Sequence, residues 1–249
     1  MEIPATSTAL ALLIALFSCF VAVRKTDVMV DRAPERPSRN GVLPAIAIDF
    51  GYWLLGPFAS MFRRLHITPN ALSLLSLPVA VIGAVMIGMG RFGLGGVILL
   101  LAFGLDAWDG IVARETDAAS DAGEVVDATL DRYSDVVAML GFLYYYRLDD
   151  VAWVLAGAAL AGTVVVSYAR AKGQAFGIDP DFGWFQRHER GVCLGVAAAV
   201  APAIAILTGE PAEHPRYYVV VLALGAIAVG TNLTAVSRTR FVINRLRTR

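Results

Sequence analysis

The chain has 249 residues, of which 57% are hydrophobic and only 17% are charged. This composition is too apolar for a soluble domain of this size and indicates an integral membrane protein. Acidic and basic residues balance to a net charge of zero, so no nucleic-acid partner is expected. Cys19 and Cys193 lie in separate apolar runs, and we expect no disulfide between them.

Apolar runs long enough to cross a bilayer recur along the chain. A bilayer core of about 30 Å needs roughly 20 mostly apolar residues per helix. The short connections between the last six runs predict one antiparallel bundle, so we expect an all-α membrane protein with a six-helix transmembrane core. The predicted spans lie at about 6–23, 70–90, 93–113, 123–146, 151–171, 190–208 and 216–237.

The N-terminal region differs from this core. Arg24 and Lys25 follow the first run and no basic residue precedes it, which is typical of a signal anchor with its N-terminus outside. We expect an extra transmembrane helix there, with a cleaved signal peptide as the alternative. Residues 1–42 therefore form an anchor and a polar linker. The aromatic and basic residues of 43–65 predict a helix along the membrane interface.

That interfacial helix opens the membrane domain, which we place at 43–240, and residues 241–249 form a basic cytoplasmic tail. Thr68 can cap the first core helix, and Pro69 suits its first turn.

Basic residues in the loops predict the orientation. If the core spans alternate, one side of the membrane receives most of the arginines and lysines, whereas the opposite loops hold Arg91, Arg147 and Arg216. By the positive-inside rule the basic side is cytoplasmic. We expect a multi-pass protein of a bacterial or archaeal inner (cell) membrane.

The segment 106–135 carries nine carboxylates and only two arginines. Carboxylates at a membrane boundary are costly unless they are paired, bound to a metal or turned to a polar cavity. The nine are Asp106, Asp109, Glu115, Asp117, Asp121, Glu124, Asp127, Asp131 and Asp135.

The spacing places these groups on two helix faces. Asp106 and Asp109 are three residues apart, and Asp127, Asp131 and Asp135 follow one another at steps of four. Facing each other across a hairpin, these like charges would need a cation between them. Hard oxygen ligands suit Mg²⁺, Mn²⁺ or Ca²⁺, and the lack of a neighbouring Cys or His argues against zinc.

Small residues and one arginine accompany the carboxylates. Gly110 follows Asp109, and Gly123 precedes Asp127 by one turn, which leaves room for a nucleobase or a diphosphate. Arg114 is placed to bind a phosphate oxygen.

The pattern D-x-x-D-G-x-x-A-R-x(8)-G-x-x-x-D-x-x-x-D is met in full, and it is similar to the motif of the CDP-alcohol phosphotransferases. The resemblance extends over the six core helices, roughly residues 45–240. The residues that meet the pattern are Asp106, Asp109, Gly110, Ala113, Arg114, Gly123, Asp127 and Asp131.

The resemblance implies a role for each aspartate of the pattern. Asp106, Asp109 and Asp127 would bind one or two divalent cations, Mg²⁺ or Mn²⁺, which hold the diphosphate of a CDP-activated donor. Asp131 would be a further metal ligand or the general base that takes the proton of the acceptor hydroxyl.

The remaining residues of the pattern would form the donor pocket. Gly110, Ala113 and Gly123 would make room for cytidine and ribose, and Arg114 would hold a phosphate. CMP would be released, the lipid product would stay in the membrane, and the protein would be a homodimer.

The loop between the fourth and fifth core helices suggests the acceptor. Its basic residues are Arg170, Lys172, Arg187 and Arg190, and a phosphorylated acceptor explains so many cations better than a neutral alcohol does. The stretch 127–135 also resembles the family branch that uses inositol phosphate. We therefore expect transfer of a phosphatidyl group from CDP-diacylglycerol to myo-inositol 1-phosphate.

Other interpretations stay open at this point. Glycerol 3-phosphate or another alcohol could be the acceptor, and the basic loop could be only a topological signal. An ion-coupled transporter is the rival class, because carboxylates within a membrane also mark ion pathways. The clustering at one membrane face and the lack of an evident inverted repeat argue against a transporter.

Overall fold

The structure is a computed structural model that describes residues 53, 61–62, 64–65, 67–115 and 120–248. Within these ranges the side chains of residues 110, 111 and 113–115 are not described. The predicted N-terminal helix, the linker and most of the predicted interfacial helix lie outside the described residues.

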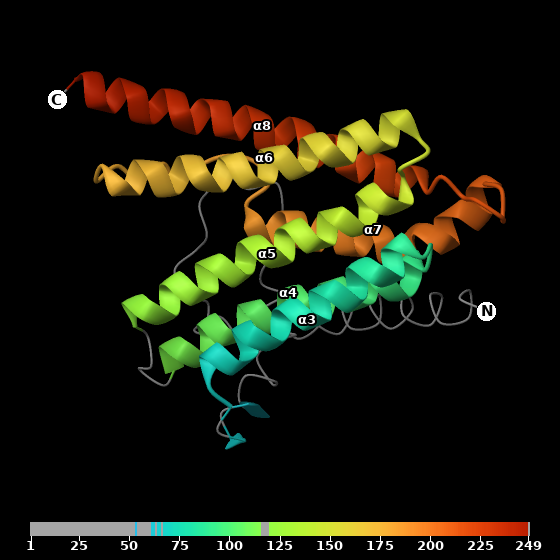
Figure 1. Ribbon diagram of the computed structural model, residues 1–249, viewed down its shortest axis with the longest axis horizontal. Coiled ribbons are helices and arrows are strands. Elements are labelled where there is room, and N and C mark those ends of the chain that lie inside the picture. Colours follow the sequence, from blue (N-terminus) through green and yellow to red (C-terminus); the bar gives the residue numbers. More distant parts are fainter. Residues whose placement is uncertain (1–52, 54–60, 63, 66, 116–119, 249) are drawn as a thin grey trace, which may run out of the picture.

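The described part of the chain is helical and contains no strand. Its helices run side by side along the long axis of the molecule (Figure 1). They are α3 (Pro69–Gly88), α4 (Phe92–Glu115), α5 (Asp121–Tyr145), α6 (Asp150–Ala175), α7 (Arg187–Thr208) and α8 (Tyr218–Arg247).

Each predicted core span is confirmed as a helix. Five of the six helices are long and apolar enough to cross a membrane, so the chain is an integral, multi-pass membrane protein. The sixth, α5, falls short of that apolarity because its first half carries the acidic residues. It nevertheless packs against α3 and α6 inside the bundle. Helix α8 continues without a break past residue 240, to Arg247.

The first core helix begins as its sequence predicts. The backbone N–H of Ala71 donates to the Thr68 hydroxyl at 3.4 Å, and Pro69 occupies the first turn. The cap satisfies a backbone donor that has no partner within the helix.

The helices pack closely where glycines lie at their contacts. A Cβ atom added to Gly96 of α4 would lie 2.3 Å from the backbone nitrogen of Ala199 in α7. One added to Gly141 of α5 would lie 2.5 Å from the carbonyl oxygen of Ala84 in α3. Small residues at such crossings let two backbones approach within a bilayer, where packing replaces the hydrophobic effect as the force between helices.

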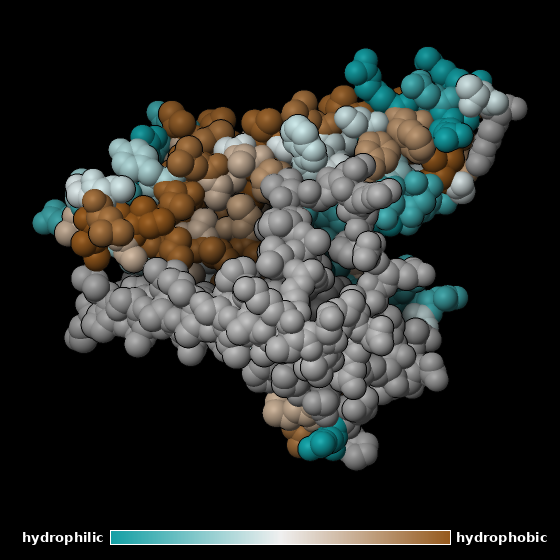
Figure 2. Space-filling view, turned by 180° about the vertical axis from the view of Figure 1, so that it is seen from behind, coloured by the Kyte–Doolittle hydropathy of each residue, from teal (hydrophilic) through white to brown (hydrophobic). Residues whose placement is uncertain are grey.

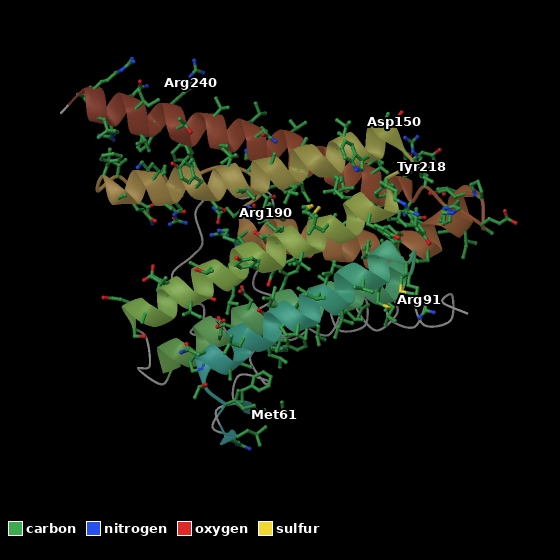
Figure 3. The ribbon with its side chains drawn as sticks, viewed as in Figure 1. Met61, Arg91, Asp150, Arg190, Tyr218 and Arg240 are labelled. Atoms are coloured by element: carbon green, nitrogen blue, oxygen red, sulfur yellow. The ribbon has the colours of Figure 1, made fainter. Side chains whose placement is uncertain are left out.

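The surface has the character expected of a membrane protein. Brown, hydrophobic side chains cover much of the middle of the described surface, and teal, hydrophilic ones gather toward the ends (Figure 2). In Figure 3, Arg240 lies toward one end of the bundle, and Arg91, Asp150 and Tyr218 lie toward the other. The apolar side chains left exposed between these ends would face lipid.

At the end of the bundle where Arg91 lies, hydrogen bonds join two of the loops. Arg216 donates to Asp149 with its Nε at 2.5 Å and its Nη2 at 2.9 Å. This hydrogen bond holds the pKa of Asp149 below its usual value. Tyr145 and Tyr146 donate their hydroxyls to the carbonyls of Pro215 and Arg216. The α5–α6 and α7–α8 connections are thereby tied together.

The glycine contact between α4 and α7 yields a first prediction. Gly96→Ala should destabilise the protein by about 1–3 kcal/mol, because the added methyl group meets backbone that side-chain rotation cannot move. Thermal unfolding in detergent, followed by tryptophan fluorescence, measures the effect. Gly157→Ala is the matched control, since a Cβ at Gly157 meets no atom within 4 Å. A Gly96→Ala protein as stable as this control would contradict the packing.

Candidate active site

Carboxylates from α4 and α5 converge at one end of the bundle. Asp106 and Asp109 lie one turn apart on α4, and Asp127 lies in the first half of α5. One carboxylate oxygen from each of the three lies within 4.8 Å of the others. The spacing predicted two facing helix faces, and the structure brings them together.

This group of three fits a divalent cation. Its donors are hard oxygens, which Mg²⁺ and Mn²⁺ prefer. The Oδ1 atom of Asp127 is buried and has no hydrogen-bond partner among the described residues. A buried, unpaired carboxylate oxygen beside two other carboxylates is costly unless a cation shares it.

A serine of α3 supports the cluster from a third helix. Ser73 is buried and donates its hydroxyl to Oδ2 of Asp109. Sequence analysis missed this residue. Its signal was a pair of serines, Ser73 and Ser76, three residues apart in an otherwise apolar helix, where each hydroxyl needs a partner.

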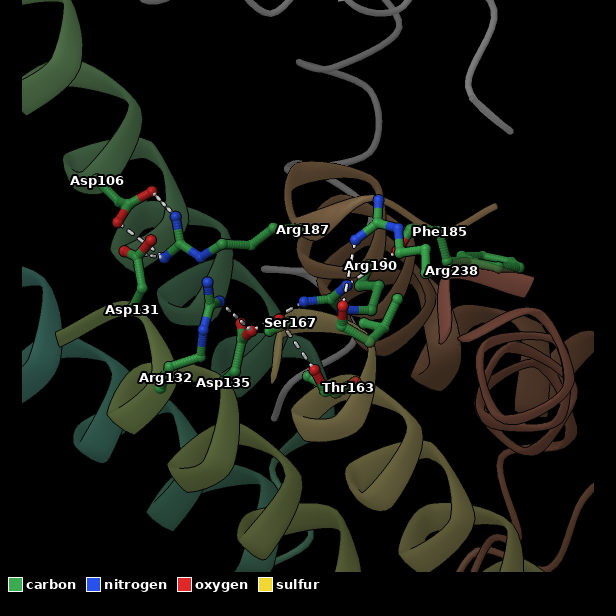
Figure 4. A network of polar contacts seen from close by, with 11 residues as sticks. Asp106, Asp131, Arg132, Asp135, Thr163, Ser167, Phe185, Arg187, Arg190 and Arg238 are labelled. Carbon is green, nitrogen blue, oxygen red and sulfur yellow. Dashed lines mark hydrogen bonds and ion pairs between the residues drawn. The ribbon is translucent and has the colours of Figure 1, made fainter. Parts of the chain in front are cut away.

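The fourth aspartate of the motif, Asp131, lies beside this group and is paired with an arginine. Arg187, the first residue of α7, reaches both Asp131 and Asp106 (Figure 4). Its Nη2 lies 2.5 Å from Oδ1 of Asp131 and donates to Oδ1 of Asp106 at 2.8 Å. Its Nη1 donates to the other oxygen of Asp106. Arg187 therefore links helices α4, α5 and α7.

Arg190 lies one turn deeper and pairs with the last aspartate of the α5 series. Its Nη2 donates to Asp135 at 3.0 Å, and its Nη1 donates to the carbonyl of Phe185 at 2.9 Å. Only about 5% of its side chain is exposed. Arg187 and Arg190 both reach aspartates of α5, but they contact different ones.

The backbone that presents both arginines is firmly held. Gln186 and Glu189 form a capping box, in which each side chain accepts from the other's backbone N–H. The loop before it passes Thr234 of α8, which accepts from the N–H of Trp184 at 3.0 Å and donates to its carbonyl. Gly183 adopts φ +124°, and a Cβ there would lie 2.1 Å from Thr234.

Arg238 of α8 holds the same loop, and sequence analysis missed it. It is buried, and it donates to the carbonyls of Phe182 at 2.8 Å and Val166 at 3.2 Å. It stands among other arginines near the C-terminus, and nothing in the local sequence distinguishes it from a solvated tail residue.

The other two basic residues predicted for the acceptor are engaged elsewhere. Arg170 donates to Asp179 at 3.0 and 3.1 Å, and its Nη1 lies 3.1 Å from Asp181. Lys172 is exposed, with its ammonium 5.4 Å from the ring centre of Phe176. These contacts tie the end of α6 to the following loop.

The predicted donor pocket is described only in part. Gly110, Ala113 and Arg114 lie on α4, but their side-chain surroundings are outside the described residues. Gly123 lies in the first turn of α5, where its N–H donates to the Ser120 hydroxyl at 3.1 Å.

The chain is similar to proteins of known family. The family model described as CDP-alcohol phosphatidyltransferase matches residues 66–228. The phosphatidylinositol phosphate synthase of Streptomyces avermitilis is 30% identical over 219 residues, which cover 83% of this chain and 85% of that protein.

The phosphatidylinositol phosphate synthase of Mycobacterium tuberculosis is 31% identical over 149 residues, which cover 58% of this chain and 69% of that protein. Its crystal structure with CDP-DAG bound has a TM-score of 0.64 at 26% identity, and the match covers 76% of this chain and 92% of that one. Its complex with manganese and citrate has a TM-score of 0.65, with coverages of 76% and 88%.

The cluster of three carboxylates yields a second prediction. Asp127→Asn should weaken Mn²⁺ binding at least about tenfold, because it removes a charge and an oxygen donor. Electron paramagnetic resonance of free Mn²⁺ measures binding to the purified protein. Glu124→Gln is the control, since it makes the same chemical change at an exposed position one turn earlier on α5. Equal Mn²⁺ affinities in the two variants would remove Asp127 from the metal site.

Proposed function

Because this chain belongs to the CDP-alcohol phosphatidyltransferase family, we propose that it transfers the phosphatidyl group of CDP-diacylglycerol to a phosphorylated polyol, myo-inositol 1-phosphate, and releases CMP. The observation that carries the proposal is the meeting of the carboxylates of Asp106, Asp109 and Asp127 beside Asp131 and Arg187. A negatively charged donor needs cations, and a hydroxyl nucleophile needs a base. The carboxylates of this site would serve both needs, three by holding a cation and one as the base.

The donor side follows from the acidic cluster. Asp106, Asp109 and Asp127 would hold one or two divalent cations, Mg²⁺ or Mn²⁺, and Asp131 would be a further ligand or the general base. A cation so bound would neutralise the diphosphate and the charge that develops on departing CMP. Gly110, Ala113, Arg114 and Gly123 would contact the nucleotide, by resemblance to the family.

In the proposed reaction Asp131 would be the general base. The oxygen of the acceptor hydroxyl attacks the phosphorus that carries diacylglycerol, and the bond from this phosphorus to the oxygen of CMP breaks. The proton of the hydroxyl passes to the Asp131 carboxylate. Arg187 holds that carboxylate in position, since its Nη2 lies 2.5 Å away.

The acceptor phosphate would bind among the arginines next to the cluster. Arg187 is partly exposed, and its guanidinium lies next to the Asp131 carboxylate. Arg190 lies behind it, and Arg170 and Lys172 lie at the end of α6. Guanidinium groups bind phosphate through paired hydrogen bonds, which a neutral alcohol would not require.

The orientation is proposed on the distribution of charge. The helix ends near the aspartates carry most of the basic residues, and the opposite loops carry Arg91, Arg147 and Arg216. By the positive-inside rule the active site would face the cytoplasm of a bacterial or archaeal cell. A homodimer is proposed by resemblance to the family.

Asp131 yields a third prediction. Asp131→Asn should lower the rate of CMP release by about 10²–10⁴-fold, because the amide cannot take the proton. The variant should keep more of its Mn²⁺ affinity than Asp127→Asn does. Asp121→Asn, at an exposed position in the first turn of the same helix, should behave as the unchanged protein does. Undiminished CMP release in Asp131→Asn would exclude Asp131 as the base.

A panel of acceptors tests the proposed reaction. Purified protein with labelled CDP-diacylglycerol and Mg²⁺ or Mn²⁺ would receive myo-inositol 1-phosphate, inositol, glycerol 3-phosphate, serine or choline. We expect myo-inositol 1-phosphate to give the highest kcat/KM, with a phosphorylated lipid product seen by mass spectrometry. A preference for glycerol 3-phosphate would change the acceptor, and CMP release that needs no divalent metal would contradict the mechanism.

A further inference from the structure

Arg187 engages two carboxylates that the proposed reaction uses for different purposes. Both oxygens of Asp106 accept from its guanidinium, and the same group lies 2.5 Å from Asp131. Asp106 is also one of the three carboxylates that fit a divalent cation. A guanidinium and a divalent cation on the same carboxylate would repel each other, because both are positively charged.

We propose that Arg187 is a displaceable counter-ion: it bridges Asp106 and Asp131 before the divalent cation binds, and it leaves Asp106 when the cation binds there. Asp106, Asp109, Asp127 and Asp131 bring four carboxyl groups into a confined site. When these carboxyl groups are ionised, their charges repel one another unless a positive charge lies between them. Arg187 reduces that repulsion until the cation replaces it.

The side chain of Arg187 is suited to such a movement, although its backbone is fixed. The capping box of Gln186 and Glu189 holds the first turn of α7. The guanidinium itself is held by Asp106 and Asp131, and its Nε is without a hydrogen-bond partner among the described residues. About 23% of the side chain is exposed, so the guanidinium is not sealed in the core as that of Arg190 is.

Arg190, one turn further along α7, is held rigidly, in contrast to Arg187. Its guanidinium is bound both to Asp135 and to the backbone carbonyl of Phe185, and its side chain is almost fully buried. Release of Arg190 would leave a buried charge unpaired, which is strongly unfavourable. Arg190 is therefore the fixed member of the pair and Arg187 the movable one.

The movement would couple the two halves of the reaction. A guanidinium released from Asp106 stays beside Asp131, because its backbone does not move, and it becomes free to bind the acceptor's phosphate. The cation and its CDP-linked donor would then precede the acceptor in binding. This last step rests on the proposed function, whereas the competition at Asp106 does not.

Metal affinity tests the competition. Mn²⁺ binding to the full-length protein in detergent, without lipid substrate or acceptor, would be measured for the unchanged chain and for Arg187→Lys, Arg187→Met and Arg132→Met. Lysine keeps the charge but loses the planar fork that bridges two carboxylates. Arg132 supplies positive charge near Asp106 and Asp127 but pairs with Asp135, so its variant reports the effect of charge alone.

We expect Mn²⁺ to bind Arg187→Lys about three- to tenfold more tightly than the unchanged chain, and Arg187→Met at least as tightly as Arg187→Lys. The Mn²⁺ affinity of Arg132→Met should rise by a smaller factor than that of Arg187→Lys. An affinity of Arg187→Lys equal to or below that of the unchanged chain overturns the proposal, because simple repulsion would then explain any gain in Arg187→Met.

Chemical labelling tests the movement in the unchanged chain. Phenylglyoxal modifies accessible guanidinium groups, and mass spectrometry locates the modified residues. Mn²⁺ should raise the labelling of Arg187 several-fold and leave the buried Arg190 unlabelled. Labelling of Arg187 that Mn²⁺ leaves unchanged or lowers contradicts the release.

These measurements separate the inference from the proposed function. Neither uses CDP-diacylglycerol or an inositol phosphate, so a wrong acceptor leaves both unaffected. Lack of Mn²⁺ binding to the unchanged chain would defeat the metal site itself and the inference with it. Mn²⁺ binding with no effect of Arg187 would defeat the inference alone.

Discussion

Repulsion among four aspartates at one end of α4 and α5 is the constraint around which this site is built. Asp106, Asp109, Asp127 and Asp131 lie on two helices whose far halves are apolar, and Asp109 and Asp131 are buried, so water cannot screen these groups fully. Positive charge has to be supplied from elsewhere in the chain or from solution. Arg187 supplies one charge from α7 to Asp106 and Asp131, and the geometry of Asp106, Asp109 and Asp127 suits a divalent cation.

A second set of polar contacts holds the backbone from which Arg187 extends. Arg190, Thr234 and Arg238 bind backbone groups of the loop that leads into α7, and Arg190 also neutralises Asp135. Each buried charge in this set has a partner, as the cost of desolvation demands. These contacts fix the position at which α7 begins. The carboxylates that Arg187 can contact therefore depend only on the conformation of its side chain.

Much of the fold was predictable from local rules. Apolar runs of about 20 residues predicted the helices, and Thr68 with Pro69 predicted where the first core helix begins. The acidic helix α5 was predicted as a span because it continues into an apolar half and lies between short connections. The partners of Ser73 and Arg238 were not predictable, since they lie on helices distant in sequence and no spacing rule relates them.

The sequence by itself determined the membrane class, the six core helices and the two sets of aspartates, because helical periodicity and hydrophobic length act within one segment. Only the tertiary structure decided how the arginines divide their roles. Arg187 and Arg190 look equivalent in sequence, three residues apart on one helix. The packing of α7 against α4 sends one to Asp106 and Asp131 and the other to Asp135, because the pairing of charges depends on which helices meet and at what depth.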